Sequence, residues 1–230
     1  MCWNAQVSIN TFLFGIFGLA FIAFNSLGSA KKPYALEFFE NPFAYFFLFT
    51  VILMQGFEYI LWKHLDNAAI NKMVSIAGLA LLAIQPVASL LLLEVKDYPF
   101  KENGTRKDYA FRNTMLGIYG VPALLYFLYN VFTTDIHTKV SPCGHLAWKW
   151  TQENISFIAV PFYLFFLFFS LIRNGYYTSL FFLALYAAFI YYFGKDGSSG
   201  SIWCLSVNLV ILYFLLQILV FIPISEMRGA

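Results

Sequence analysis

The sequence predicts an all-α polytopic membrane protein, with residues 1–230 forming a single domain of seven transmembrane helices in one bundle. Three observations predict this fold class. The chain is 60% hydrophobic and only 11% charged, whereas soluble domains carry roughly 25% charged residues. Its mean hydropathy is +0.70. Apolar runs of about 17–25 residues, the length at which a helix crosses a bilayer, recur from one end of the chain to the other.

Seven apolar runs predict the spans, and turn residues separate them. The runs are 8–25, 42–62, 71–93, 113–133, 155–172, 176–193 and 202–224. They lack a two-residue polar and apolar alternation, which favours helices over barrel strands. The segment SLGSAKKP ends the first run, Asn41–Pro42 opens the second, and RNG and KDGSSGS separate the last three. No Lys or Arg precedes the first run, so we expect a retained span rather than a cleaved signal peptide.

The distribution of basic residues predicts the orientation. With seven spans, five Lys fall on the N-terminal side and nine Lys or Arg on the other. Cytoplasmic loops carry the excess of positive charge, so we expect an extracytoplasmic N-terminus and a cytoplasmic C-terminus. A glycosylation sequon, Asn103–Thr105, lies on the cytoplasmic side of this arrangement and argues against it. The charge count outweighs a three-residue motif that recurs by chance.

The small net charge limits the partners. A formal charge of +2 provides no basic surface for nucleic acid. The expected partners are the lipid bilayer and a small solute or ion, and the sequence is compatible with a homo-oligomer.

The unusual side chains fall on the N-terminal side of the predicted bundle. All five tryptophans, all three histidines and all three cysteines are assigned to that side. Tryptophan is ordinary at a membrane interface, but His and Cys have no such preference. We interpret this face as a functional vestibule. The alternative is that these residues fall on one side by an accident of composition.

Glu58 is the principal candidate for a functional residue. Gln55, Glu58 and Trp62 follow i, i+3, i+7 spacing and share one helix face. A charged group at the centre of a span costs about 2.5–3.5 kcal/mol on insertion scales, and burial favours the neutral carboxyl. We therefore interpret Glu58 as a protonatable or cation-binding group. The alternative is a structural hydrogen bond to a neighbouring helix.

Further solute-binding candidates are polar or aromatic residues of the other spans and of the N-terminus. Gln85 would shape the polar path together with Gln55, and Trp3, Trp62 and Trp203 would form a lid. The remaining candidates are Asn4, Tyr126, Tyr213 and Gln217. The alternative role for the tyrosine and glutamine side chains of these spans is ordinary packing between helices.

A membrane-embedded metal, redox or lipid-modifying enzyme is the alternative function. Cys143 and His145 lie in the loop PCGHLAWKW and could join Cys2 and Cys204 in a metal site. Because the spacing of these residues is not CxxC, no metal site is predicted. If this side is extracytoplasmic, a disulfide between two of the three cysteines is favoured instead. GxSxG, HExxH and phosphate-binding glycine loops are absent, so no catalytic residue is predicted. No lysine lies in the last run, which excludes retinal.

The segments MCWNAQVSINTFLF, MQGFEYILWKH and IQPV resemble an uncharacterised seven-span membrane protein family of large DNA viruses of algae and protists and of related hosts. The resemblance covers the first hundred residues best and implies no activity. It points to three residues at the N-terminus and to four in the predicted spans, namely Cys2, Trp3, Asn4, Gln55, Glu58, Trp62 and Gln85. The sequence thus predicts a transporter or channel first, the membrane-embedded enzyme second, and a membrane-assembly protein third.

Overall fold

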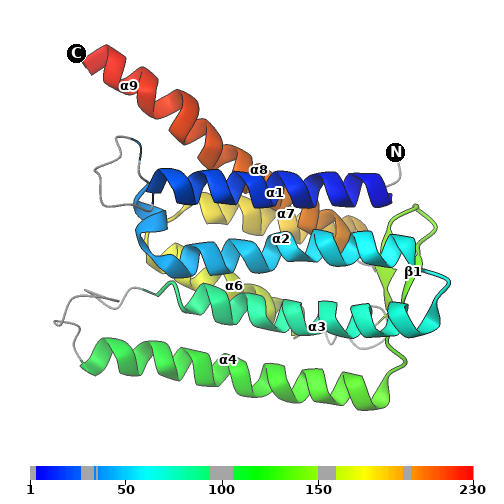
Figure 1. The fold of residues 1–230 in the computed structure, drawn as a ribbon. Coiled ribbons are helices and arrows are strands. Elements are labelled where there is room, and N and C mark those ends of the chain that lie inside the picture. The colour runs from blue at the N-terminus through cyan, green and yellow to red at the C-terminus, as the bar shows by residue number, and fades with distance from the viewer. Residues whose placement is uncertain are drawn as a thin grey trace.

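The computed structural model of the chain describes residues 4–26, 34, 36–93, 106–149, 159–193 and 198–229, with backbone alone at 106–108, 193, 199–207 and 228–229. Its long helices lie side by side in one bundle (Figure 1). The elements in chain order are α1 (Ala5–Ser26), η1 (Glu37–Glu40), α2 (Pro42–Lys63), α3 (Ala68–Leu90), α4 (Arg106–Thr133), β1 (Thr138–Val140), β2 (Leu146–Trp148), α6 (Ala159–Arg173), α7 (Thr178–Phe193), α8 (Ser199–Leu216), the π-helical turn η2 (Gln217–Phe221) and α9 (Ile222–Gly229).

Asparagine side chains begin the first three helices. The Oδ1 atoms of Asn4, Asn41 and Asn67 accept hydrogen bonds from the backbone N–H groups of Val7, Phe43 and Ile70, at 3.0, 3.0 and 3.1 Å. An N-cap oxygen satisfies one of the four N–H groups that a helix leaves unpaired. Pro42 after Asn41 needs no N–H partner, so the local sequence alone specifies the start of α2.

Within the described residues, five helices are long and apolar enough to cross a membrane, which indicates an integral membrane protein. They are α1, α2, α3, most of α4 (Tyr109–Thr133) and Asn208–Met227 at the end of the chain. Helices α6 and α7 have 15 and 16 residues. At 1.5 Å per residue they measure about 22 and 24 Å, less than the ~30 Å hydrocarbon core. The helical fold is confirmed, and seven crossings stay a prediction.

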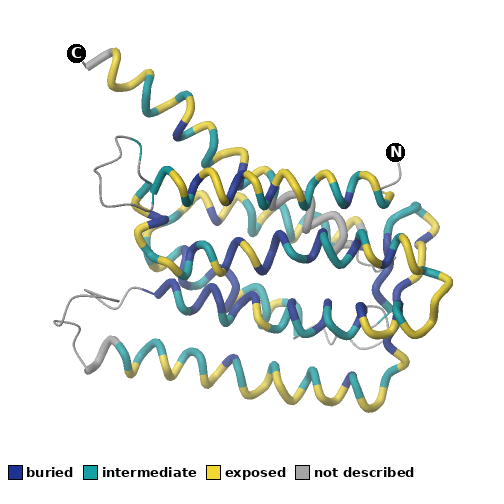
Figure 2. Tube along the Cα trace, in the orientation of Figure 1, coloured by how far each residue is buried: buried dark blue, intermediate teal, exposed yellow. Residues whose placement is uncertain are grey.

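The core of the bundle is built around α2 and α3. Helix α2 packs between α1 and α3, while α3 also contacts α4 and α6, and α8 packs on α1 and α2. Figure 2 shows buried residues concentrated along α2 and α3, and exposed ones along α4 and α9. The exposed residues of α4 include Leu124, Leu125 and Phe132. Such a surface suits contact with lipid.

The loop predicted over 134–154 contains a β-hairpin, a departure from the all-α prediction. Strands β1 and β2 pair antiparallel, with Thr138 opposite Trp148 and Val140 opposite Leu146. Gly144 in the turn has φ of 79°, a conformation that side chains other than glycine adopt at a cost. The hairpin lies at the end of the bundle where α2 ends and α3 begins (Figure 1).

Candidate functional site

A chain of polar side chains joins the partly buried Thr11 of α1 to two buried residues of α2. The Thr11 hydroxyl donates to Oε1 of Gln55 at 2.7 Å, and Nε2 of Gln55 donates to Oε2 of Glu58 at 3.2 Å. Gln55 and Glu58 are each only 2% exposed. The predicted shared face of Gln55 and Glu58 is thus present, and it turns toward α1.

Trp62 extends this polar cluster by one turn toward the end of α2. It is partly buried and packs against the hydrophobic core. Its Nε1 atom is buried and has no hydrogen-bond partner among the residues that the structure describes. The cluster of Thr11, Gln55, Glu58 and Trp62 therefore combines a carboxyl group, an amide and an unused indole N–H within about two helical turns.

Gln85 forms a separate polar contact in the middle of the bundle. Its Oε1 accepts from the Tyr163 hydroxyl of α6 at 2.7 Å, and its Nε2 donates to the Thr50 carbonyl of α2 at 3.4 Å. Gln85 is fully buried. It therefore ties α2, α3 and α6 together across the core.

The other predicted solute-binding residues lie apart from Glu58. Asn4 caps α1, and Tyr126 lies on α4, which Figure 1 places on the far side of α3 from α2. Tyr213 and Gln217 line a cavity formed by other parts of the bundle. The positions of Trp3 and of the Trp203 side chain fall outside what the structure describes. The predicted residues are thus divided among several places.

The hairpin is fastened to the start of α3 by one asparagine. Asn71 is buried, and its Nδ2 donates to the carbonyls of Thr138 and Leu65, at 2.8 and 3.2 Å. Its Oδ1 accepts from the Thr138 backbone N–H at 2.8 Å and the Ser75 hydroxyl at 3.2 Å. All four hydrogen-bonding positions of this amide are therefore used.

Trp148 fixes the hairpin by packing as well. Its side chain is buried, and a Cβ atom added to Gly78 of α3 would lie 2.6 Å from the Cζ3 atom of the Trp148 ring. Glycine at this position lets the indole lie directly on the α3 backbone. The end of the bundle at α3 is thus filled by the hairpin.

Cys143 and His145, the weakest metal candidates, lie in the hairpin turn. The Cys143 thiol is 2.9 Å from the Ser141 hydroxyl and 3.6 Å from that of Ser198. Burial lowers the pKa of the His145 imidazole, which favours its neutral form near pH 7. Among the described residues no three His, Cys, Asp or Glu side chains are grouped closely enough to hold a metal ion. Cys2 and the Cys204 side chain lie outside that set.

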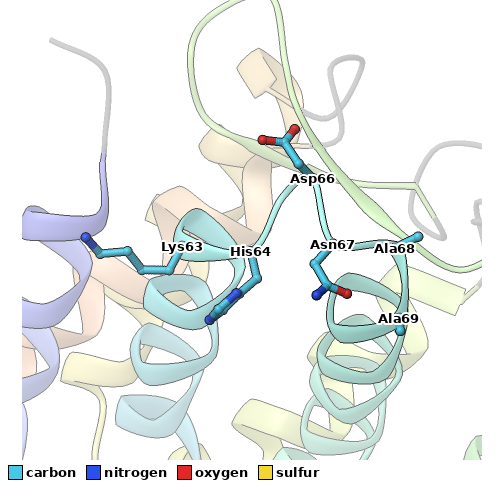
Figure 3. Close-up of a pocket in the computed structure, with 6 residues that line it drawn as sticks. All are labelled: Lys63, His64, Asp66, Asn67, Ala68 and Ala69. Atoms are coloured by element: carbon cyan, nitrogen blue, oxygen red, sulfur yellow. The ribbon is translucent and has the colours of Figure 1, made fainter.

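An open hollow of about 630 Å³ lies over the turn between α2 and α3. Figure 3 shows Lys63 extending to one side and Asp66 pointing away from the helices, while His64 and Asn67 turn toward them. Because the two charged groups diverge, they do not hold one ligand between them. This hollow is therefore not a second candidate site beside the Glu58 cluster.

Several polar residues of the core are not among the sequence-predicted candidates. Thr11, Asn71, Tyr163 and the pair Ser89 and Ser170, whose hydroxyls lie 2.6 Å apart between α3 and α6, all make interhelical or hairpin contacts. Single polar residues in apolar runs carry a weak signal, because ordinary packing explains most of them. An observable signal exists for the hairpin, namely the Pro-Cys-Gly turn between two short alternating segments.

Comparison with known proteins does not assign a family. No protein-family model, curated protein or solved structure matches the chain. The resemblance to the viral membrane family stays a prediction.

Proposed function

We propose that the protein is an integral membrane transporter or channel for a small solute or ion, with Glu58 as its protonatable or cation-binding group. The observation that carries the proposal is the buried carboxyl group of Glu58, held at one oxygen by the amide of Gln55. Ionisable groups inside membrane helices are rare and costly, and they mark ion or proton pathways more often than structural contacts.

The neighbours of Glu58 suit this role. Gln55 is held by Thr11, so its N–H faces the carboxyl oxygen without any rearrangement. The Trp62 ring one turn further along α2 would shield the carboxyl group from the aqueous side. Glu58 is five residues from the end of α2 at Lys63, or roughly 7–8 Å along the axis at 1.5 Å per residue. That depth suits a site entered from the side of the N-terminus.

The charge distribution favours an extracytoplasmic N-terminus, so solute would enter from the extracytoplasmic side. The hairpin packs at the same end of the bundle, and Asn71 and Trp148 hold it there. We propose that the vestibule lies on the α1 and α2 side of the hairpin, next to Trp62.

The proposal is tested by flux into liposomes that hold the purified protein. Proton entry is followed with an internal pH-sensitive dye, and Na⁺ and K⁺ entry with radioactive tracers. Glu58→Gln removes the charge and the titration but keeps the shape of the side chain. Glu226→Gln is the matched control, because Glu226 is an exposed carboxylate of α9.

We expect flux in at least one of the three assays, its loss in Glu58→Gln and its retention in Glu226→Gln. Equal flux in the wild type and Glu58→Gln contradicts the role of Glu58. A wild-type protein without flux of any of the three ions contradicts an ion-conducting or proton-coupled function.

A further inference from the structure

A second cavity lies within the bundle, toward the end opposite the hairpin. Its volume is about 300 Å³, and residues of η1, α2, α6, α7, α8 and η2 line it. Its walls are mainly apolar and include Phe47, Val51, Leu167, Phe168 and Phe182. At ~30 Å³ for each water-sized unit, the space holds about ten non-hydrogen atoms. That is the size of a small ligand or of the apolar part of a larger one.

One carboxylate lies at this cavity, and no countercharge is paired with it in the part of the chain that the structure describes. Glu37 of η1 lines the cavity and is exposed. Among the described residues its carboxylate makes no hydrogen bond or ion pair, and none of the residues that line the cavity is Lys or Arg. The site therefore attracts positive rather than negative charge.

Three aromatic rings line the same cavity as Glu37. The ring of Phe38, next to Glu37, is stacked on Phe214 at 5.4 Å and meets Tyr176 edge-on at 5.0 Å. Aromatic faces beside a carboxylate are the arrangement that recognises ammonium groups through cation–π contacts.

Two further features are typical of a ligand site rather than of plain packing. Ser179 at the start of α7 is only 6% exposed, and its hydroxyl has no hydrogen-bond partner among the described residues. Gln217 lines the cavity and begins the π-helical turn η2. Such turns are rare and occur frequently at functional sites.

We propose that this cavity binds an amphiphile bearing an ammonium group, with the cation between Glu37 and the aromatic rings and the apolar part among the phenylalanine side chains. The cavity is separate from the Glu58 cluster, because none of the four residues of that cluster lines it. The shared chemistry is an alkylammonium, which a choline lipid or a soluble amine would supply. The proposal does not depend on transport.

The test is equilibrium dialysis of radioactive hexyltrimethylammonium against the protein in a non-ionic maltoside detergent, with protein-free micelles subtracted. This probe has ten non-hydrogen atoms, so it matches the cavity in size. Hexanol replaces it as the neutral counterpart. Glu37→Gln removes the carboxylate, and Glu40→Gln is the matched control because Glu40 is exposed on the same short helix but does not line the cavity.

We expect one saturable site for the ammonium probe in the wild type, in Glu40→Gln and in Glu58→Gln. We expect about tenfold weaker binding in Glu37→Gln, from loss of the charge contact, and no saturable binding of hexanol. Val51→Phe should also abolish binding, because its ring fills the cavity. Displacement of the probe by added phosphatidylcholine identifies a lipid headgroup as the source, and lack of displacement identifies a soluble amine.

Three results overturn the proposal. They are the absence of saturable binding to the wild type, equal affinity in Glu37→Gln and the wild type, and hexanol binding as tight as that of the ammonium probe. Because the Glu37 side chain is exposed, we expect its substitution to leave the folded protein intact, so the result reports the site itself. Loss of flux in Glu58→Gln with intact probe binding separates this proposal from the transport proposal.

Discussion

The Nε2 atom of Gln55 lies 3.2 Å from Oε2 of Glu58, so an amide of α2 donates a hydrogen bond to the buried carboxyl group one turn away. The other end of the amide accepts from the Thr11 hydroxyl of α1. An amide rotated by half a turn would place its oxygen against the carboxyl oxygen. The contact with α1 therefore decides that a donor faces Glu58.

Thr11→Val should weaken this arrangement while keeping the shape of the side chain. The Gln55 oxygen loses its partner, and we expect a loss of about 1 kcal/mol in the free energy of unfolding, within the range for hydrogen bonds between membrane helices. The amide becomes free to rotate, so the environment of Glu58 should change. Thermal unfolding measures the stability, and the carboxyl stretching band assigned with Glu58→Gln in infrared difference spectra measures the environment.

Thr11→Ser is the control, because it keeps the hydroxyl and removes only a methyl group. The Thr11 hydroxyl also lies 2.9 Å from the Val7 carbonyl and 3.0 Å from the Ser8 carbonyl, so its single proton is shared among three acceptors, of which the Gln55 oxygen is the nearest at 2.7 Å. If Thr11→Ser shifts the carboxyl band as much as Thr11→Val does, the effect comes from packing, and the proposed orientation of Gln55 by Thr11 is wrong.

The helices were predictable from the sequence because their signals are long and local. The predicted span 42–62 matches α2 almost residue for residue, since Asn41 and Pro42 define its start. The start of α4 lies seven residues before the predicted 113, at Arg106. Polar and charged residues precede its apolar run, so hydropathy locates the membrane-crossing part rather than the end of the helix.

The partners of the polar side chains were not predictable in the same way. The spacing of Gln55 and Glu58 predicts their shared face, but nothing in that spacing identifies Thr11, 44 residues earlier in the chain. Likewise the sequence singles out Gln85 but not Tyr163, which donates to it from α6. Such contacts depend on which helices become neighbours, and a single sequence does not contain that information.

Asn71→Leu should release the hairpin from α3. The substitution leaves the buried N–H and carbonyl of Thr138 without their partners, at about 1–3 kcal/mol for each unsatisfied group. We expect a marked loss of thermal stability together with faster amide hydrogen exchange across Thr138–Trp148. Hydrogen exchange followed by mass spectrometry measures both strands in one experiment.

Asn67→Ala provides the matched control for Asn71. Asn67 is also an asparagine at the start of α3, but its side chain caps the helix, and it makes no hydrogen bond to the hairpin among the described residues. Loss of a cap costs about 1 kcal/mol, without faster exchange in the hairpin. Equal exchange in the hairpin of both variants would show that Asn71 acts only on α3.

Gly78→Ala tests the contact of the Trp148 ring with α3. Alanine is the better helix former by about 1 kcal/mol, so helix propensity alone predicts a gain in stability. The added Cβ atom would lie 2.6 and 2.8 Å from two atoms of the Trp148 ring, so the indole must move. We therefore expect Gly78→Ala to lower the melting temperature and to change the fluorescence of Trp148.

The same substitution at Gly117 of α4 separates the clash from helix propensity. Apart from the adjacent residues and the backbone of α4 itself, no described atom lies within 4 Å of a Cβ built at Gly117, so Gly117→Ala should be neutral or stabilising by up to about 1 kcal/mol. Trp148→Phe removes part of the indole, so Gly78→Ala should cost less stability when combined with Trp148→Phe than it does alone. Additive losses in the double variant would mean that the two residues do not touch. The hairpin would then require a different packing at the end of α3.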